Sequence, residues 1–315
     1  MQANNSDPRI YCQLQDLMAL QPKAAALAAL PKRAMKNILT GSHRSHLRGR
    51  GLNFEELRGY TVGDDIRTMD WKVTNRTRKP HVRVYTEERE RNVLLLVDQR
   101  SHMFFGSQAY IKSVTAAEAS TLALWHTLAQ HDRIGALVFD DEHIQQIKPQ
   151  RSRAASLQIL QSIVAKNNAL SAQPHKQKPE QLNHVLTEAL RLCGHDYLVI
   201  LVSDLNGMDT HTTQTLKRIK THNDVIVTQV VDPMEQRLES LETQDHALVM
   251  GDGDLQINVN PKKAVWTKEY ESTQIHAQSN LENALRLLRI PLLTVDTLSQ
   301  PHGQLQTAIT ASAQQ

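Results

Sequence analysis

A short segment of the chain places acidic and basic side chains at the end of an apolar run. Residues 93–97 are all apolar and lead directly into Asp98, and Arg100 and His102 follow within four positions. In open α/β sheets, ligands bind beyond the carboxyl ends of the strands, so an acid in this position is placed to handle a cation or a ligand. A second acid, Asp204, follows another apolar run. We therefore predict that Asp98 and Asp204 lie at one edge of a sheet.

Two sources of positive charge are possible for these acids. Carboxylates that lie close together repel each other unless a positive charge sits beside them. A divalent cation such as Mg²⁺ supplies that charge and prefers oxygen ligands in near-octahedral geometry. Arg100 is the other source, because a guanidinium neutralises a carboxylate through charge-assisted hydrogen bonds and would repel a metal in the same pocket. We expect no metal and no cofactor, with Mg²⁺ as the alternative. The Asp98–Arg100 pair then either contacts a partner or only holds its loop.

Ser101 lies beside His102, which raises the question of a nucleophilic serine. A triad is defined by the geometry of its members in space, and adjacency in sequence gives no such geometry. We therefore expect the protein not to be an enzyme.

A repeated strand–helix pattern positions these residues. Segments of helical apolar spacing separate the apolar runs, which predicts βαβ units and a mostly parallel sheet with helices on both faces. The fold class is therefore α/β. The expected strands are residues 92–98, 133–140, 196–203, 224–231 and 291–297.

The sequence before the first of these strands is of a different kind. We expect an N-terminal extension over residues 1–90, the α/β domain over 91–300 and a frayed tail over 301–315. The extension carries a compact block of glycine, acids, bases and a tryptophan. We call it the signature block, and it consists of Gly63, Asp64, Asp65, Ile66, Arg67, Asp70, Trp71 and Lys72, followed by Asn75, Arg76 and Thr77 and then by Glu88 and Glu90.

This block, together with the strand that ends at Asp98, resembles the bacterial domain-of-unknown-function family fifty-eight over roughly residues 10–300. In that family a similar block precedes a von Willebrand factor A-like domain. The resemblance implies a protein that works with MoxR-type AAA+ ATPases and has no established enzymatic activity.

The resemblance also implies the positions of a divalent-cation site, formed in A domains by a DxSxS motif, a later Thr and a second Asp. Here Asp98 and Asp204 match the two acids. The two serine positions hold Arg100 and His102, and the Thr position falls near Gln181. All three hydroxyl ligands are therefore replaced, which indicates a degenerate metal site.

The block around Trp71 has a structural and a functional interpretation. In the structural one, Gly63 supplies a turn, Asp64 or Asp65 caps the segment after it, and Trp71 fills an apolar seam and is largely buried. In the functional one, the acids and bases of the block grip a partner. We favour the structural interpretation.

Composition restricts the function classes. Aromatic residues make up only 4% of the 315 residues, which argues against a stacking surface for single-stranded nucleic acid. Residues 32–91 contain 15 Lys or Arg and 8 Asp or Glu and are net +7, whereas the rest of the chain is net −4. This asymmetry favours an acidic partner and leaves nucleic-acid binding through residues 32–91 as an alternative.

Two cysteines without a paired spacing, a polar N-terminus and no long apolar run indicate a cytoplasmic protein without membrane insertion. We expect a non-enzymatic interaction or adaptor protein that partners a MoxR-type AAA+ ATPase and other A-domain proteins in protein assembly or maturation. A metal-dependent ligand-binding A domain is the alternative.

Overall fold

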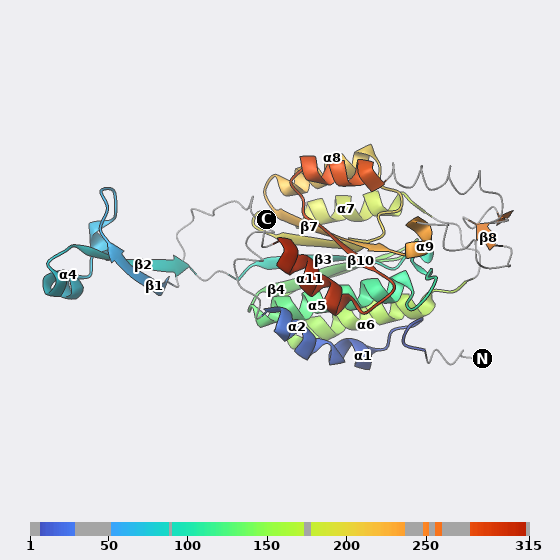
Figure 1. Ribbon diagram of the computed structural model, residues 1–315, viewed down its shortest axis with the longest axis horizontal. Coiled ribbons are helices and arrows are strands. Elements are labelled where there is room, and N and C mark those ends of the chain that lie inside the picture. The colour runs from blue at the N-terminus through green and yellow to red at the C-terminus, as the bar shows by residue number, and fades with distance from the viewer. Residues whose placement is uncertain are drawn as a thin grey trace. The chain divides into compact units, whose positions relative to one another are not determined.

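The computed structural model describes residues 7–28, 52–87, 90–172, 178–236, 248–251, 256–259 and 278–312. The chain forms two compact units (Figure 1). We call residues 1–43 and 91–315 the α/β unit, and residues 44–90 the hairpin unit.

A six-stranded sheet forms the centre of the α/β unit. Its strands are β3 (Asn92–Asp98), β4 (Arg133–Phe139), β5 (Ile144–Gln150), β6 (Leu198–Ser203), β7 (Asp224–Val231) and β10 (Leu292–Asp296). The strand order is β10-β7-β6-β3-β4-β5, and every neighbouring pair is parallel except β4 and β5. This topology confirms the predicted α/β, von Willebrand A-like fold, and five strands lie where the sequence placed them.

The inner strands are buried on both faces of the sheet. Val93, Leu95 and Val97 pack into one hydrophobic cluster, and Leu94 and Leu96 pack into another. A strand covered on both sides has no solvent-facing positions, which explains why its sequence is continuously apolar.

Helices cover both faces. Side chains of α5 (Lys112–Ala129) and α6 (Arg153–Ala169) belong to the first cluster. Those of α7 (Gln181–Leu192), α8 (Thr210–Lys220) and the helix at 278–287 belong to the second.

Side-chain caps set where two of these helices begin. The Ser152 side chain accepts a hydrogen bond from the Ala155 N–H at the start of α6. At the start of α8, Asp209 and Thr212 form a reciprocal capping box. Such caps satisfy backbone N–H groups that have no partner within the helix.

The edge strand β5 was not predicted. Its sequence, IQQIKPQ, is polar, and only Ile147 within it is buried. An edge strand exposes much of its surface to water and therefore shows no continuous apolar run. Proline at residue 149 is compatible with an edge, because a proline cannot donate to a second ladder.

The predicted boundary at residue 90 coincides with the end of the hairpin unit. The described residues 7–28, which were assigned to the N-terminal extension, belong to the α/β unit instead. Two helices, α1 (Leu14–Ala19) and α2 (Gln21–Ala28), pack against α5 in the α/β unit. Leu17, Leu20 and Ala24 are buried in the same cluster as β3. These helices are only six and eight residues long, so their apolar residues form too short a pattern to predict packing against α5.

The prediction that residues 301–315 form a frayed tail is also wrong for residues 301–312. These residues form helix α11 (Pro301–Ser312), which packs on β10 and α5. Leu305 and Ile309 are buried in the first cluster. The Gln304 side chain fixes the approach to α11 by accepting a hydrogen bond from the Asp296 N–H at 2.7 Å.

The hairpin unit contains two antiparallel strands, β1 (Leu52–Gly59) and β2 (His81–Glu87). Between them lie a short 3₁₀ helix, η1 (Ile66–Thr68), and helix α4 (Trp71–Thr77). Val82 is buried, but a single two-stranded hairpin offers little area for a core of its own.

None of the described helices is long and apolar enough to cross a membrane. Residues 32–51 of the basic segment and Glu88 of the signature block lie outside the described residues.

Candidate functional site

Asp98 ends β3 at the carboxyl edge of the sheet and forms a bidentate ion pair with Arg100. The Arg100 Nε donates to Asp98 Oδ1 at 3.0 Å, and Nη2 donates to Oδ2 at 2.7 Å. Ser203 Oγ donates to Asp98 Oδ2 at 2.6 Å. Both charged side chains are 0% exposed. Each carboxylate oxygen of Asp98 is therefore already satisfied by the protein.

The environment of Arg100 keeps it cationic despite its burial. Its Nη2 also donates to the Asn206 carbonyl at 3.1 Å, and its guanidinium lies 5.6 Å from the Phe139 ring centre. Burial acts to lower the pKa of Arg100, but the charge of Asp98 and its hydrogen bonds outweigh it, and the pKa is raised. A buried charge is tolerated because it is paired and hydrogen-bonded.

Asp204, in the loop after β6, is neutralised by two other side chains. His102 Nε2 lies 2.8 Å from Asp204 Oδ1, and Lys112 Nζ lies 2.8 Å from Asp204 Oδ2. Burial acts to raise the pKa of Asp204, but the charges of His102, Lys112 and Arg100 hold it well below its usual range. Asp204 is therefore a buried, paired carboxylate.

Lys112, the first residue of α5, links Asp204 to a third acid. Its Nζ lies 2.6 Å from Glu235 Oε1, in the short helix α9 (Pro233–Gln236), and its side chain is 2% exposed. Burial acts to lower the pKa of Lys112, but Asp204 and Glu235 raise it overall. Sequence analysis missed Lys112, Glu235 and Ser203. Each of these contacts joins residues that are 92 or more positions apart, so local sequence gave no signal for them.

The predicted meeting of Asp98 and Asp204 is present in the structure. Ligand atoms of Asp98, His102 and Asp204 lie within 4.8 Å of one another, a spacing compatible with a metal ion. The donor set does not fit a divalent cation, however. Arg100 and Ser203 occupy the oxygens of Asp98, while His102 and Lys112 occupy those of Asp204. A divalent ion there would face buried Arg and Lys charges, and the two serine positions of the DxSxS motif hold Arg100 and His102.

Gln181, at the position that corresponds to the later Thr, is not part of this cluster. It is the first residue of α7, and its Oε1 faces His184 Nδ1 at 3.3 Å. Among the described residues, no hydrogen bond joins Gln181 to Asp98 or to Asp204.

Ser101 does not have the geometry of an activated nucleophile. Its backbone N–H donates to Asp141 Oδ2 at 2.7 Å. In the described part of the chain, its hydroxyl has no hydrogen-bond partner. The Nε2 of the neighbouring His102 faces Asp204 instead of Ser101.

The acids of the signature block organise the hairpin unit. Asp64 pairs with Arg58 at 2.7 Å. Asp70 caps α4 by accepting the Val73 N–H at 3.0 Å and pairs with Arg83 at 2.8 Å. The Val73 N–H and then the Arg83 guanidinium hold the pKa of Asp70 below its ordinary value.

Other members of the block also have local roles. The Asp65 side chain accepts the Arg67 N–H at the start of η1. Gly63 adopts φ 109°, which fits its predicted turn.

The prediction that Trp71 is largely buried is wrong. Trp71 begins α4, and 67% of its surface is exposed. The unit around it is a two-stranded hairpin with a seven-residue helix, which is too small to enclose an indole. Lys72, Arg76 and Arg67 are also exposed.

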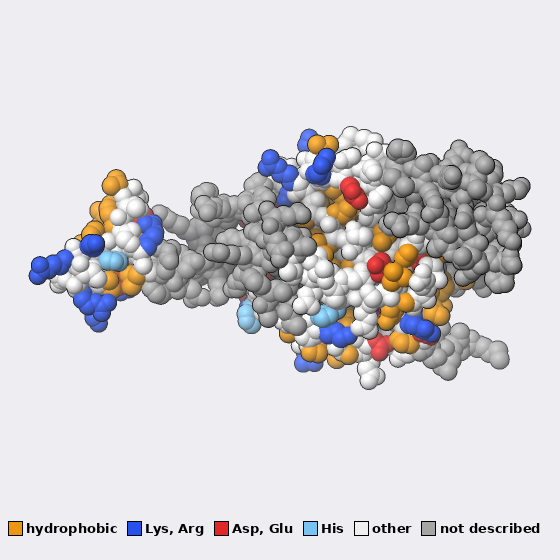
Figure 2. Space-filling model, in the orientation of Figure 1, with side chains coloured by type: hydrophobic (Ala, Val, Ile, Leu, Met, Phe, Trp, Pro, Cys, Tyr) orange, Lys and Arg blue, Asp and Glu red, His pale blue; other side chains and the backbone are white. Residues whose placement is uncertain are grey.

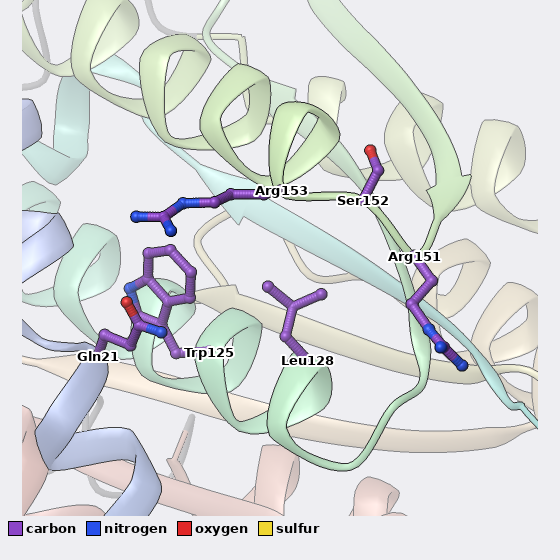
Figure 3. Close-up of a pocket in the computed structure, with 6 residues that line it drawn as sticks. All are labelled: Gln21, Trp125, Leu128, Arg151, Ser152 and Arg153. Carbon is purple, nitrogen blue, oxygen red and sulfur yellow. The ribbon is translucent and has the colours of Figure 1, made fainter.

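A separate cavity of about 220 Å³ lies among α2, the end of α5 and the start of α6 (Figure 3). Asp98 lies beside Phe139, at the end of β4. The residues that lead into α6 follow Gln150, which pairs with Ile134 near the start of β4, so the cavity lies at the opposite end of the sheet from Asp98. In Figure 3 the Arg153 side chain extends over Trp125, whereas that of Arg151 points away from it. The cavity is lined by Gln21, Trp125, Leu128, Arg151, Ser152 and Arg153.

The sheet defines a von Willebrand A-like α/β fold, and the acids at its edge are paired with basic side chains of the same chain. A family model described as "Protein of unknown function DUF58" matches residues 56–278, and the chain belongs to this family. Uncharacterized protein Rv1480 of Mycobacterium tuberculosis is similar, with 28% identity over 219 residues, which cover 68% of this chain and 67% of the relative. Uncharacterized protein Mb1516 of Mycobacterium bovis matches to the same extent.

Solved structures with similarity to the chain include BatB from Bacteroides thetaiotaomicron, at 13% identity and a TM-score of 0.39, covering 71% of this chain and 100% of that one. An aerotolerance-related membrane protein from Bacteroides fragilis is similar at 12% identity and a TM-score of 0.40, covering 71% and 98%. A von Willebrand factor type A structure from Catenulispora acidiphila is similar at 10% identity and a TM-score of 0.35, covering 73% and 43%.

Proposed function

We propose that this protein is a non-enzymatic interaction protein, an adaptor that works with a MoxR-type AAA+ ATPase in the assembly or maturation of other proteins. One observation carries the proposal. The two acids at the sheet edge are already paired with Arg100, His102 and Lys112, so the edge needs no metal to hold them together. What the molecule offers a partner is then its surface.

The absence of activated groups among the described residues at this edge supports a role other than catalysis. Asp98 and Asp204 are buried in ion pairs, and no general base contacts the Ser101 hydroxyl there. A general base must reach the proton that it removes, and a paired buried carboxylate is poorly placed to do so. The choice of an ATPase as partner, and of other A-domain proteins as further partners, rests on the family resemblance. The cytoplasmic location rests on the two cysteines without a paired spacing.

The test is direct binding between the purified full chain and the MoxR-type ATPase of the same organism. Size-exclusion chromatography with light scattering should show a complex at micromolar concentration with ATP present. An Asp98→Asn, Arg100→Gln variant removes the charges of the pair and keeps polar side chains at both positions, and it should still form the complex if it folds. Elution of the two unmodified proteins as separate species at all concentrations and nucleotide states would refute the partnership.

A further inference from the structure

Three large apolar side chains are exposed on the hairpin unit, close together in sequence. Val62 is 101% exposed, Ile66 is 60% exposed and Trp71 is 67% exposed. Exposed apolar side chains that occur singly are ordinary, whereas several on one small unit are a candidate interaction site. Val62 lies just before the block, Ile66 is the first residue of η1, and Trp71 is the first residue of α4.

Exposed cations accompany these apolar side chains. Of the acids nearby, Asp64 pairs with Arg58 and Asp70 pairs with Arg83. Asp65 accepts the backbone N–H of Arg67. Within the described residues, no ion pair involves five exposed cations of η1, α4 and the turn after α4. They are Arg67, Lys72, Arg76, Arg78 and Lys79. We call these cations, with Val62, Ile66 and Trp71, the signature surface.

The local structure presents the signature surface in a defined way. Asp70 both caps α4 and holds Arg83 of β2, which ties the helix to the hairpin. Arg78 ends α4 in the left-handed region, at φ 54°. Figure 2 shows Lys and Arg side chains beside hydrophobic ones on this unit. The acids of the block thus stabilise the unit internally, and its cations and apolar groups face outward.

We propose that the signature surface docks an acidic segment of a partner protein that also carries apolar side chains. This inference rests on the proposed function and names where the partner binds. Charge complementarity selects an acidic partner, because the five cations pair with no carboxylate of the described residues. Three of the five are arginines, whose planar forks match carboxylates, and Trp and Arg are enriched at the centres of protein interfaces.

A nucleic-acid backbone would engage the cations and leave Val62 and Ile66 without apolar contacts. A membrane surface is disfavoured by the length of α4, because its seven residues form a shorter element than interfacial amphipathic helices.

The experiment measures binding of the full chain to a fluorescent peptide of alternating Glu and Leu by anisotropy. Peptides with Ser in place of Leu, a single-stranded RNA and phosphatidylglycerol vesicles serve as comparison probes. The Glu–Leu peptide should bind more tightly than the Glu–Ser peptide, the RNA and the vesicles. A Lys72→Glu, Arg76→Glu variant should weaken that binding by about tenfold or more, because reversed charges repel the acidic probe. Trp71→Ala should weaken it through loss of apolar contact.

Matched controls come from the α/β unit. Arg218 is an exposed cation of α8 without a described ion pair, and Leu287 is an 83% exposed apolar residue. Arg218→Glu and Leu287→Ala should leave the affinity within about twofold, as expected for surface residues outside an interface. Melting curves of all variants should match that of the unmodified protein.

Three outcomes would overturn the proposal. RNA or vesicles could bind more tightly than the peptide with the same dependence on Lys72 and Arg76. Trp71→Ala could lower the melting temperature by several degrees without changing peptide affinity, which would make the surface an interface within the chain. The signature variants could also leave peptide affinity unchanged. If the ATPase binds the unmodified protein and these variants equally, the docking surface is wrong and the proposed function stands. If the ATPase binds neither while the peptide binds as expected, the ATPase partnership is wrong.

Discussion

The two units handle their charged residues in opposite ways. In the α/β unit, Arg100 and Lys112 are buried against acids, with exposed fractions of 0% and 2%. In the hairpin unit, Lys72 and Arg76 are exposed and have no ion pair among the described residues, and Trp71 is exposed beside them. A sizeable hydrophobic core can absorb paired charges, whereas a hairpin has too little interior to do so. The fully buried ion pairs therefore lie in the α/β unit, whereas the hairpin unit pairs its acids with half-exposed arginines and leaves further cations exposed.

The largest expected effect comes from breaking the buried pair at Asp98. Arg100→Met leaves a buried carboxylate without its cation and should cost about 3–5 kcal/mol of unfolding free energy. Urea unfolding at pH 7 measures this cost. Arg218→Met, at an exposed arginine of the same unit, should cost less than about 0.5 kcal/mol. Equal urea midpoints for Arg100→Met and Arg218→Met would show that the buried arginine contributes no more to stability than the exposed one.

The two tryptophans sharpen the comparison between units. Trp125 is 4% exposed and its Nε1 donates to the Leu17 carbonyl at 3.1 Å, so Trp125→Ala should cost about 3–5 kcal/mol. Trp71→Ala should change stability by less than about 0.5 kcal/mol, because the side chain is exposed. Thermal unfolding of both variants distinguishes them, and a large loss for Trp71→Ala would show that the hairpin unit buries its tryptophan after all.

Glu118 tests the packing of the N-terminal helices on α5. Burial raises the pKa of Glu118 from 4.5 to about 7, although Lys23 acts to lower it. Between these values the folded protein keeps a proton that the unfolded chain has lost, so this group makes stability fall as pH rises. Glu118→Gln should remove that fall and increase stability at pH 8 by about 1–3 kcal/mol, with little change at pH 4.

Chemical denaturation across this pH range provides the measurement for Glu118. Glu180→Gln, at an exposed carboxylate, is the matched control and should leave the pH profile unchanged. A Glu118→Gln profile that still falls between pH 4.5 and 7 as steeply as that of the unmodified protein would contradict the prediction.

The smallest expected effect is that of divalent ions on the unmodified protein. An ion that binds only the folded state stabilises it by about 2.7 kcal/mol at a hundredfold excess over Kd. Millimolar Mg²⁺ or Mn²⁺ should nevertheless leave the melting temperature unchanged, because Arg100 already neutralises Asp98. An Arg100→Ser, His102→Ser variant should gain a response, reduced by Lys112. A rise with Mg²⁺ in the unmodified protein that Asp98→Ala abolishes would refute this account.

The inner sheet could be predicted from sequence because burial on both faces imposes continuous apolar runs, as in residues 93–97. The edge strand β5 and the helix α11 could not be predicted in this way. The edge strand is largely polar, and the burial of Leu305 depends on where the chain returns to the sheet. The hydrophobic pattern of a segment shows which of its own faces is apolar. It does not show which distant segment will pack against that face.

The candidate site divides in the same way. Asp98 and Arg100 are two positions apart, so their pairing followed from local sequence and charge. Lys112 meets Asp204 across 92 positions and Glu235 across 123, and only the folded sheet brings these residues together. The expectation for Trp71 failed because it depended on a partner surface that the small hairpin does not supply.

The cation beside Asp98 is covalently attached to the chain, which has a kinetic consequence. A bound metal ion can leave and return while the protein stays folded, and a chelator can remove it. Arg100 cannot leave the folded protein, and a chelator cannot remove it. Its backbone N–H also donates to Asp98 Oδ1 at 3.0 Å within the buried site. Hydrogen–deuterium exchange at this amide therefore requires the sheet edge itself to open. We expect this amide to be among the slowly exchanging ones of the molecule, whether or not Mg²⁺ is present.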